Sequence, residues 1–109
     1  MYIDRMKNTG RIPVQRVQTG IRMEKRILKV LKGLAEYHDL TLGDLLEGIV
    51  LHAFEGKAPF GHASRAKILD LRKVYDLDLN AAASHRLVER REAEGVELPR
   101  KVLLRKGRR

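Results

Sequence analysis

The stretch Arg16-Val17-Gln18-Thr19-Gly20-Ile21-Arg22-Met23 alternates in chemical character from one residue to the next. One side carries mostly apolar residues, Val17, Thr19, Ile21 and Met23, whereas the other carries Arg16, Gln18, Gly20 and Arg22. A period of two is typical of a β-strand with unlike faces. No turn nearby offers a second strand, and a lone strand leaves its backbone donors and acceptors unpaired. We therefore expect this strand to pair with the same strand of a second copy of the chain.

Amphipathic helices are predicted on the C-terminal side of this strand. A first helix is predicted over residues 25–38, because apolar residues recur there at helical spacing: Ile27, Leu28, Leu31, Leu34 and Ala35. Asp39 stands where a residue of left-handed conformation would follow that helix. Thr41 is expected to cap a second helix, with Asp44 as its reciprocal partner and Gly56 as its end. Gly33 lies inside the first helix and Gly48 inside the second, either as close-crossing points or, more commonly, as tolerated surface glycines.

The remainder of the chain is predicted to be helical with basic ends. Ser64 is expected to cap a helix from Arg65 to about Tyr75, and a thin helix is expected from Leu79 or Asn80 to Glu94. Pro and Gly residues before Ser64 indicate a linker. The expected order is a flexible basic arm (1–13), a strand-helix-helix domain (14–56), a linker (57–63), a helical extension (64–95) and a polybasic tail (96–109).

The charge of the chain is positive and unevenly distributed. Among 109 residues there are 23 Lys and Arg against 14 Asp and Glu, which gives a formal net charge of +9. Residues 1–23 sum to +4, residues 24–55 to −2 and residues 56–109 to +7. Basic ends of this kind favour a polyanionic partner such as nucleic acid, although solubility alone is the simpler alternative.

The composition also excludes several classes of protein. The chain contains no cysteine, which excludes disulfides, zinc ribbons and cysteine nucleophiles. Met1 to Pro13 lack the apolar core of a signal peptide, and no window holds about 18 consecutive apolar residues. We therefore expect a cytoplasmic protein.

The order strand, helix, tight turn and helix over about residues 16–55 resembles the ribbon-helix-helix family of bacterial and phage repressors. The resemblance rests on the alternation from Arg16 to Met23, on the helical spacing from Ile27 to Ala35, and on the turn Asp39-Leu40-Thr41 before Leu45-Leu46. It implies a mainly α dimer in which one short N-terminal strand of each chain pairs across the dimer, followed by two helices and here by a C-terminal helical extension. The implied function is a nucleoid-associated, sequence-specific DNA-binding repressor whose two-stranded ribbon enters the major groove.

The resemblance also assigns roles to residues of the strand. Gln18, Gly20 and Arg22 take the base-facing positions, where Gln pairs with adenine and Arg with guanine. Gly20 departs from the family pattern, because it has no side chain with which to read a base. Arg16, one step outside these three, is expected to be an additional DNA contact.

Further DNA and dimer contacts are expected elsewhere in the chain. The amides at the start of the second helix, at Thr41, Leu42 and Gly43, are expected to anchor a DNA phosphate. Non-specific DNA contacts are expected from basic residues near both ends: Arg5, Lys7, Arg11, Arg100, Lys101, Arg105, Lys106, Arg108 and Arg109. The dimer core is expected to hold Val17, Ile21, Met23, Ile27, Leu28, Leu31, Leu34, Leu45, Leu46, Ile49 and Val50.

Other chemistry finds little support in the sequence. The histidines His38, His52, His62 and His85 are scattered, and neither a nucleophile triad nor a phosphate-binding loop is visible. No metal, cofactor or enzymatic activity is therefore expected. Two alternatives stay open. One is an antitoxin that represses its own operon and neutralises a toxin, its protein partner, through residues 57–109; the other is a non-specific nucleic-acid architectural or partition protein.

Deletion of residues 100–109 is expected to weaken binding to all DNA sequences alike and to flatten the salt dependence. The reason is that this segment carries six basic residues and no acidic one, and each phosphate neutralised releases counterions. The measurement is the affinity for selected and random duplexes at several salt concentrations. An unchanged salt slope would show that these bases serve a partner other than DNA.

Overall fold

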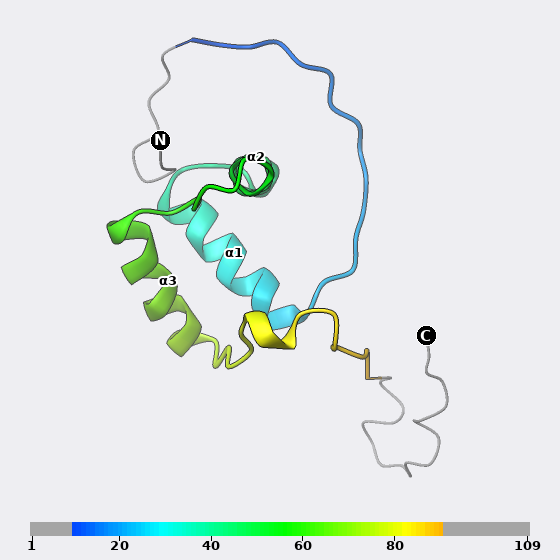
Figure 1. Ribbon diagram of the computed structural model, residues 1–109, viewed down its shortest axis with the longest axis vertical. Coiled ribbons are helices and arrows are strands. Elements are labelled where there is room, and N and C mark those ends of the chain that lie inside the picture. Colours follow the sequence, from blue (N-terminus) through cyan, green and yellow to red (C-terminus); the bar gives the residue numbers. More distant parts are fainter. Residues whose placement is uncertain (1–9, 91–109) are drawn as a thin grey trace. The chain divides into compact units, whose positions relative to one another are not determined.

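The computed structural model describes residues 10–90, and their regular structure is helical. The helices are α1 (Lys25–Tyr37), α2 (Leu42–Phe54) and α3 (His62–Val74), followed by the short 3-10 turn η2 (Ala81–Ala83). The chain divides into two compact units, with the boundary between Asp78 and Leu79. All three α-helices therefore belong to the first unit (Figure 1).

Helices α1 and α3 lie side by side and antiparallel (Figure 1). At one end of the pair, the Lys29 ammonium lies 5.9 Å from the ring centroid of Tyr75. At the other end, Nε2 of His38 lies 2.8 Å from Oγ of Ser64. Midway, a Cβ placed on Gly33 would lie 2.9 Å from Cδ2 of Leu71. Gly33 is therefore a close-crossing point, and the absence of its side chain lets α3 approach α1.

The core of the first unit is centred on the apolar stripe of α1. Leu34 and Ala35 are buried together with Leu45 of α2, and Leu34 and Leu45 are only 1% and 0% exposed. Helix α2 is seen end-on in Figure 1, so it crosses the direction of α1. Partly buried side chains from the helices and their connections pack around this centre: Leu31, Leu40, Ile49, Phe60, Ile68 and Leu71. The stripe predicted for the first helix therefore serves two neighbouring helices at once.

Each α-helix ends in the same backbone motif, a left-handed residue followed by a return hydrogen bond. After α1, Asp39 has φ 58° and the Leu40 amide donates to the Ala35 carbonyl at 2.9 Å. Gly56 with φ 71° ends α2, and Asp76 with φ 54° ends α3. The left-handed residue turns the chain back, so that the amide after it donates to a carbonyl of the last turn that has no partner within the helix. The predicted stops at Asp39 and Gly56 are confirmed.

The starts of the helices agree only partly with expectation. Thr41 caps α2 as predicted, since its Oγ1 accepts from the Asp44 amide at 3.1 Å. Glu24 caps α1, with Oε1 accepting from the Arg26 and Ile27 amides at 2.9 and 3.0 Å. The prediction that Ser64 caps the third helix is wrong, because α3 begins at His62 and the fully buried Ser64 hydroxyl contacts His38 instead.

The strand predicted for residues 16–23 is not formed. Residues 10–24, called the N-terminal segment from here on, follow a drawn-out course outside any helix (Figure 1). No β-strand occurs anywhere in residues 10–90, so the predicted ribbon-helix-helix fold is wrong in its ribbon. Alternation specifies which side chains share a face, but a strand also needs a neighbour for its backbone hydrogen bonds. No part of the described chain provides that neighbour.

The described part of the second unit, residues 79–90, contains less regular structure than predicted. In place of the thin helix expected from Leu79 or Asn80, residues 79–90 contain only η2. The Asn80 side chain caps η2 by accepting from the Ala82 amide at 3.0 Å. Short alanine-rich segments gain little without an apolar stripe packed on a neighbour, which explains why the helix does not propagate.

None of the helices within residues 10–90 is long and apolar enough to cross a lipid bilayer.

Replacing Asp39 by Gly is expected to stabilise the protein by about 0.5–1 kcal/mol, because glycine adopts positive φ without a Cβ clash and removes a negative charge from a helix C-terminus. Urea unfolding followed by circular dichroism measures the change. Asp70→Gly is the matched control: Asp70 lies within α3, so glycine there should destabilise by about 0.5–1 kcal/mol. The same sign for both variants would contradict the account of the α1 stop.

Candidate nucleic-acid interface

The side chains predicted to read DNA bases lie on the surface of the N-terminal segment. Gln18, Gly20 and Arg22 are all exposed. A Cβ added to Gly20 would meet nothing within 4 Å, so no packing contact excludes a side chain there. The apolar side of the segment is also uncovered: Val17 is 79% and Ile21 71% exposed. The N-terminal segment thus presents both its polar and its apolar side chains to solvent.

Arg16 joins the N-terminal segment to α2. Its guanidinium forms a two-pronged contact with Glu47, with Nε 2.9 Å from Oε2 and Nη2 2.7 Å from Oε1. The same Nη2 lies 3.2 Å from Oδ1 of Asp44. The hydrogen bond to Glu47 is the main cause that raises the pKa of Arg16, and it lowers the pKa of the Glu47 carboxyl. Arg16 is therefore held by two carboxylates, although it was predicted as a DNA contact.

The N-terminus of α2 carries the residues predicted to anchor a phosphate. Thr41 and Gly43 are exposed and Leu42 is half-buried. The cap bond of Thr41 takes up the Asp44 amide, while the Asp44 carboxylate faces Arg16 rather than the cap. Arg16 thus offsets the negative charge that would otherwise oppose an anion beside this turn. The structure brings Arg16 and the start of α2 together, although Arg16 and Asp44 are 28 positions apart in the sequence.

Charge is segregated among the helices of the first unit. Helix α1 carries four basic residues and one acidic residue, Lys25, Arg26, Lys29, Lys32 and Glu36. Helix α3 likewise carries four and one, Arg65, Lys67, Arg72, Lys73 and Asp70. Helix α2 has neither Lys nor Arg but contains Asp44 and Glu47. The antiparallel pair of α1 and α3 is therefore basic, whereas α2 is acidic.

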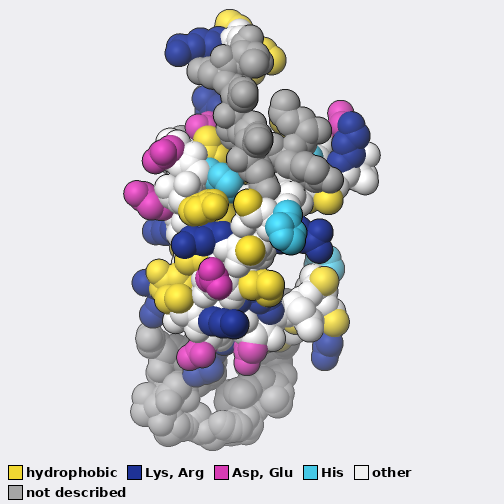
Figure 2. All heavy atoms as spheres, turned by 90° about the vertical axis from the view of Figure 1, so that its left-hand side faces the viewer, with side chains coloured by type: hydrophobic (Ala, Val, Ile, Leu, Met, Phe, Trp, Pro, Cys, Tyr) yellow, Lys and Arg dark blue, Asp and Glu magenta, His cyan; other side chains and the backbone are white. Residues whose placement is uncertain are grey.

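Basic side chains do not form a continuous patch on the face shown in Figure 2. Figure 2 shows a face on which Lys and Arg lie among hydrophobic, acidic and histidine side chains. The Lys67 ammonium of α3 lies 5.2 Å from the ring centroid of Tyr37, a distance at which the aromatic ring attracts the cation. A polyanion on the face shown in Figure 2 would thus meet separate cations rather than a uniform surface.

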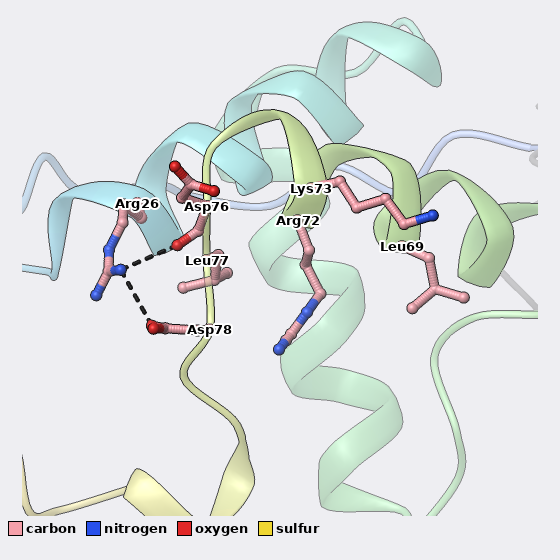
Figure 3. A pocket seen from close by; sticks show the side chains of 7 residues that line it. All are labelled: Arg26, Leu69, Arg72, Lys73, Asp76, Leu77 and Asp78. Carbon is pink, nitrogen blue, oxygen red and sulfur yellow. Dashed lines mark hydrogen bonds and ion pairs between the residues drawn. The ribbon is translucent and has the colours of Figure 1, made fainter.

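A shallow pocket lies where α3 ends beside the start of α1 (Figure 3). Arg26 occupies one wall, where its Nη1 donates to the Asp76 carbonyl at 3.0 Å and to Asp78 at 3.1 Å. The Arg26 Nε also donates to Glu24 at 2.9 Å. Burial opposes ionisation of Glu24, but the bonds from the Arg26 side chain and the Ile27 amide lower the pKa of its carboxyl. Arg26 therefore ties the cap of α1 to the end of α3.

The residues predicted for a dimer core fall into three groups of exposure. Leu34 and Leu45 are buried within the single chain. Val17, Ile21 and Val50 are exposed, the last by 42%. The others are half-buried: Met23, Ile27, Leu28, Leu31, Leu46 and Ile49. On α2 the exposed set extends to two residues that were not predicted, Leu51 at 64% and Phe54 at 80%.

Among the basic residues predicted as non-specific DNA contacts, Arg11 is described and exposed. The others lie outside the described residues: Arg5, Lys7, Arg100, Lys101, Arg105, Lys106, Arg108 and Arg109.

Several interactions had no signal in the sequence. Glu47 lies within a predicted helix, but nothing in its spacing identifies Arg16 as its partner. The contact between His38 and Ser64 likewise joins positions 26 residues apart. Residues 10–90 contain no cluster of His, Cys, Asp and Glu that could hold a metal ion. Asp44 and Glu47, two acids without a basic residue in α2, are a local feature that favours a basic neighbour but does not identify it.

No protein-family model, curated protein or solved structure matches the chain.

Lowering the pH is expected to reduce the stability of the protein, in part through protonation of Glu24. Its pKa is lowered in the folded chain, so its contribution is fully present above the unfolded pKa of about 4.3 and is lost as the pH falls through the folded value. Glu24→Gln should therefore lower the urea midpoint near neutral pH and make its decline between about pH 5 and pH 3 shallower. Arg26→Gln removes the guanidinium but leaves the amide donors of Arg26 and Ile27, so it should have the same effect to a smaller extent. Parallel declines in variant and native protein would contradict the role of this cap.

Proposed function

We propose that the protein binds double-stranded DNA in a sequence-specific manner and acts as a transcriptional repressor. The observation that carries this proposal is the N-terminal segment, whose hydrogen-bonding and basic side chains are exposed next to a basic helical unit. Amide and guanidinium groups are the side chains best suited to base edges. The whole chain has a formal net charge of +9, which also supports a polyanionic partner.

The chemistry of the helices supports a division of roles among them. Helix α2 would be a poor reader of DNA, because it lacks Lys and Arg and presents Asp44 and Glu47. Helices α1 and α3 carry exposed bases such as Lys25, Lys32 and Lys73, which suit phosphate contacts. We therefore assign sequence reading to the N-terminal segment and electrostatic attraction to α1 and α3.

Within the N-terminal segment, Gln18 and Arg22 are the proposed readers. Gln can bond the N6 and N7 edge of adenine, and Arg the O6 and N7 edge of guanine. Gly20 lies between them with open space around its Cα, so the backbone can approach DNA closely at that step. The start of α2, from Thr41 to Gly43, is the proposed phosphate anchor.

The exposed apolar side chains support a homodimer. Val50, Leu51 and Phe54 lie within two turns of α2 at helical spacing, and each is at least 42% exposed. A small chain that leaves large apolar side chains in water gains stability when a second copy covers them. Two copies would also place two DNA-reading segments on one assembly, which favours operators with two-fold symmetry.

Selection of bound duplexes from random DNA tests the proposed function. The expected result is a recurring sequence with two-fold symmetry, bound more tightly than random DNA. Equal binding of all sequences would favour a non-specific architectural protein instead. No binding at any salt concentration would overturn the proposal.

Arg22→Ala is expected to cost about 1–3 kcal/mol on the selected sequence and to relax the preference at one base pair of each half-site. Lys32→Ala is the control: Lys32 is an exposed base on α1, so its removal should weaken all sequences alike. Fluorescence anisotropy on the selected duplex and on single-base variants measures both effects. Unchanged discrimination in Arg22→Ala would remove this residue from the readers.

A further inference from the structure

The contact between Arg16 and α2 is positioned to control where the N-terminal segment lies. Asp44, Glu47, Leu51 and Phe54 recur at helical spacing, so they share one face of α2. The first turns of that face are acidic, and the last turns are apolar and exposed. Arg16 binds at the acidic end through both prongs of its guanidinium. The contact therefore sets one point of the segment relative to the helical unit.

The geometry of this contact is more restrictive than that of a single ion pair. A planar guanidinium that donates two parallel bonds to one carboxylate fixes direction as well as distance. The bond to Asp44 from the same guanidinium adds a second carboxylate one turn away. Only Val17 lies between Arg16 and Gln18, so a fixed Arg16 limits where this proposed reader can lie.

We propose that Glu47, assisted by Asp44, is a positioning residue that acts through Arg16 to hold the N-terminal segment against the first turns of α2, ready to engage DNA. This proposal rests on the proposed DNA-binding function. It assigns Asp44 and Glu47 a role in favour of DNA binding, although both carry negative charge. An acid near DNA repels phosphate, whereas Glu47 promotes binding because it orders the segment that reads the bases.

The first test needs no DNA. The chain has no cysteine, so Gln15→Cys provides a single attachment site for a nitroxide spin label beside Arg16. The expected result is restricted motion of the label in the otherwise native protein and about a two- to fivefold loss of the restricted population in Glu47→Gln. Equal mobility in both proteins would overturn the anchoring role.

The second test measures affinity for the selected duplex. Glu36→Gln is the matched control, because Glu36 is an exposed glutamate in the last turn of α1 and its loss changes the net charge equally. Removing an acid should by itself strengthen binding to a polyanion. Glu47→Gln is expected instead to weaken binding about two- to fivefold. Glu47→Gln binding as tightly as Glu36→Gln would overturn the proposal.

The third test is the exchanged pair Arg16→Glu with Glu47→Arg. Each single change should free the label and weaken DNA binding, whereas the exchanged pair should recover the restricted label motion and part of the affinity. Failure of the pair to restrain the label would overturn the direct coupling of these two residues. If the native protein binds no duplex at all, the proposed function fails, and the label measurements still decide whether Glu47 anchors the segment.

Discussion

The structure depends on one packing constraint: the apolar stripe of α1 must be covered by two helices at once. Leu34 and Ala35 are buried there with Leu45 of α2, and α3 approaches the same helix where Gly33 leaves room for Leu71. Burial of such side chains is the main favourable term available to a chain of this size. Interactions at the ends of the α1 and α3 pair, at His38 with Ser64 and at Lys29 with Tyr75, follow from that alignment.

The N-terminal segment is not held by apolar packing, because none of its residues belongs to this core. Most of its apolar side chains are exposed, and the ion pairs of Arg16 with Asp44 and Glu47 lie in solvent. Exposed ion pairs contribute little to stability, because solvent screens them and ordering two long side chains costs entropy. Their effect is mainly on position, and a segment held this lightly can exchange its contacts for those of a partner at low cost.

In the helical unit, the surface suited to a polyanion and the surface suited to a second copy of the chain lie on different helices. The bases of α1 and α3 and the acids and exposed apolar residues of α2 belong to different elements. A second copy on α2 would leave the bases of the other two helices accessible. The proposal of a DNA-binding dimer rests on this separation and does not depend on a β-ribbon.

The sequence by itself determined the helices α1 and α2 and their ends, because those features depend on neighbours a few residues apart. The apolar spacing from Ile27 to Ala35, the cap at Thr41 and the stops at Asp39 and Gly56 are all local. Alternation placed Gln18 and Arg22 on one side of their stretch, whereas their role as readers came from the family resemblance, and the structure adds only that they are exposed.

Only the tertiary structure decided what distant residues do to one another. Alternation at Arg16 to Met23 could not supply the second strand that a ribbon requires, and the described chain has none. Ser64 has the composition of a cap, but its burial against His38 follows from the docking of α3 on α1. Arg16 meets Glu47 across 31 residues, and such a pair forms only when packing brings both elements to one place.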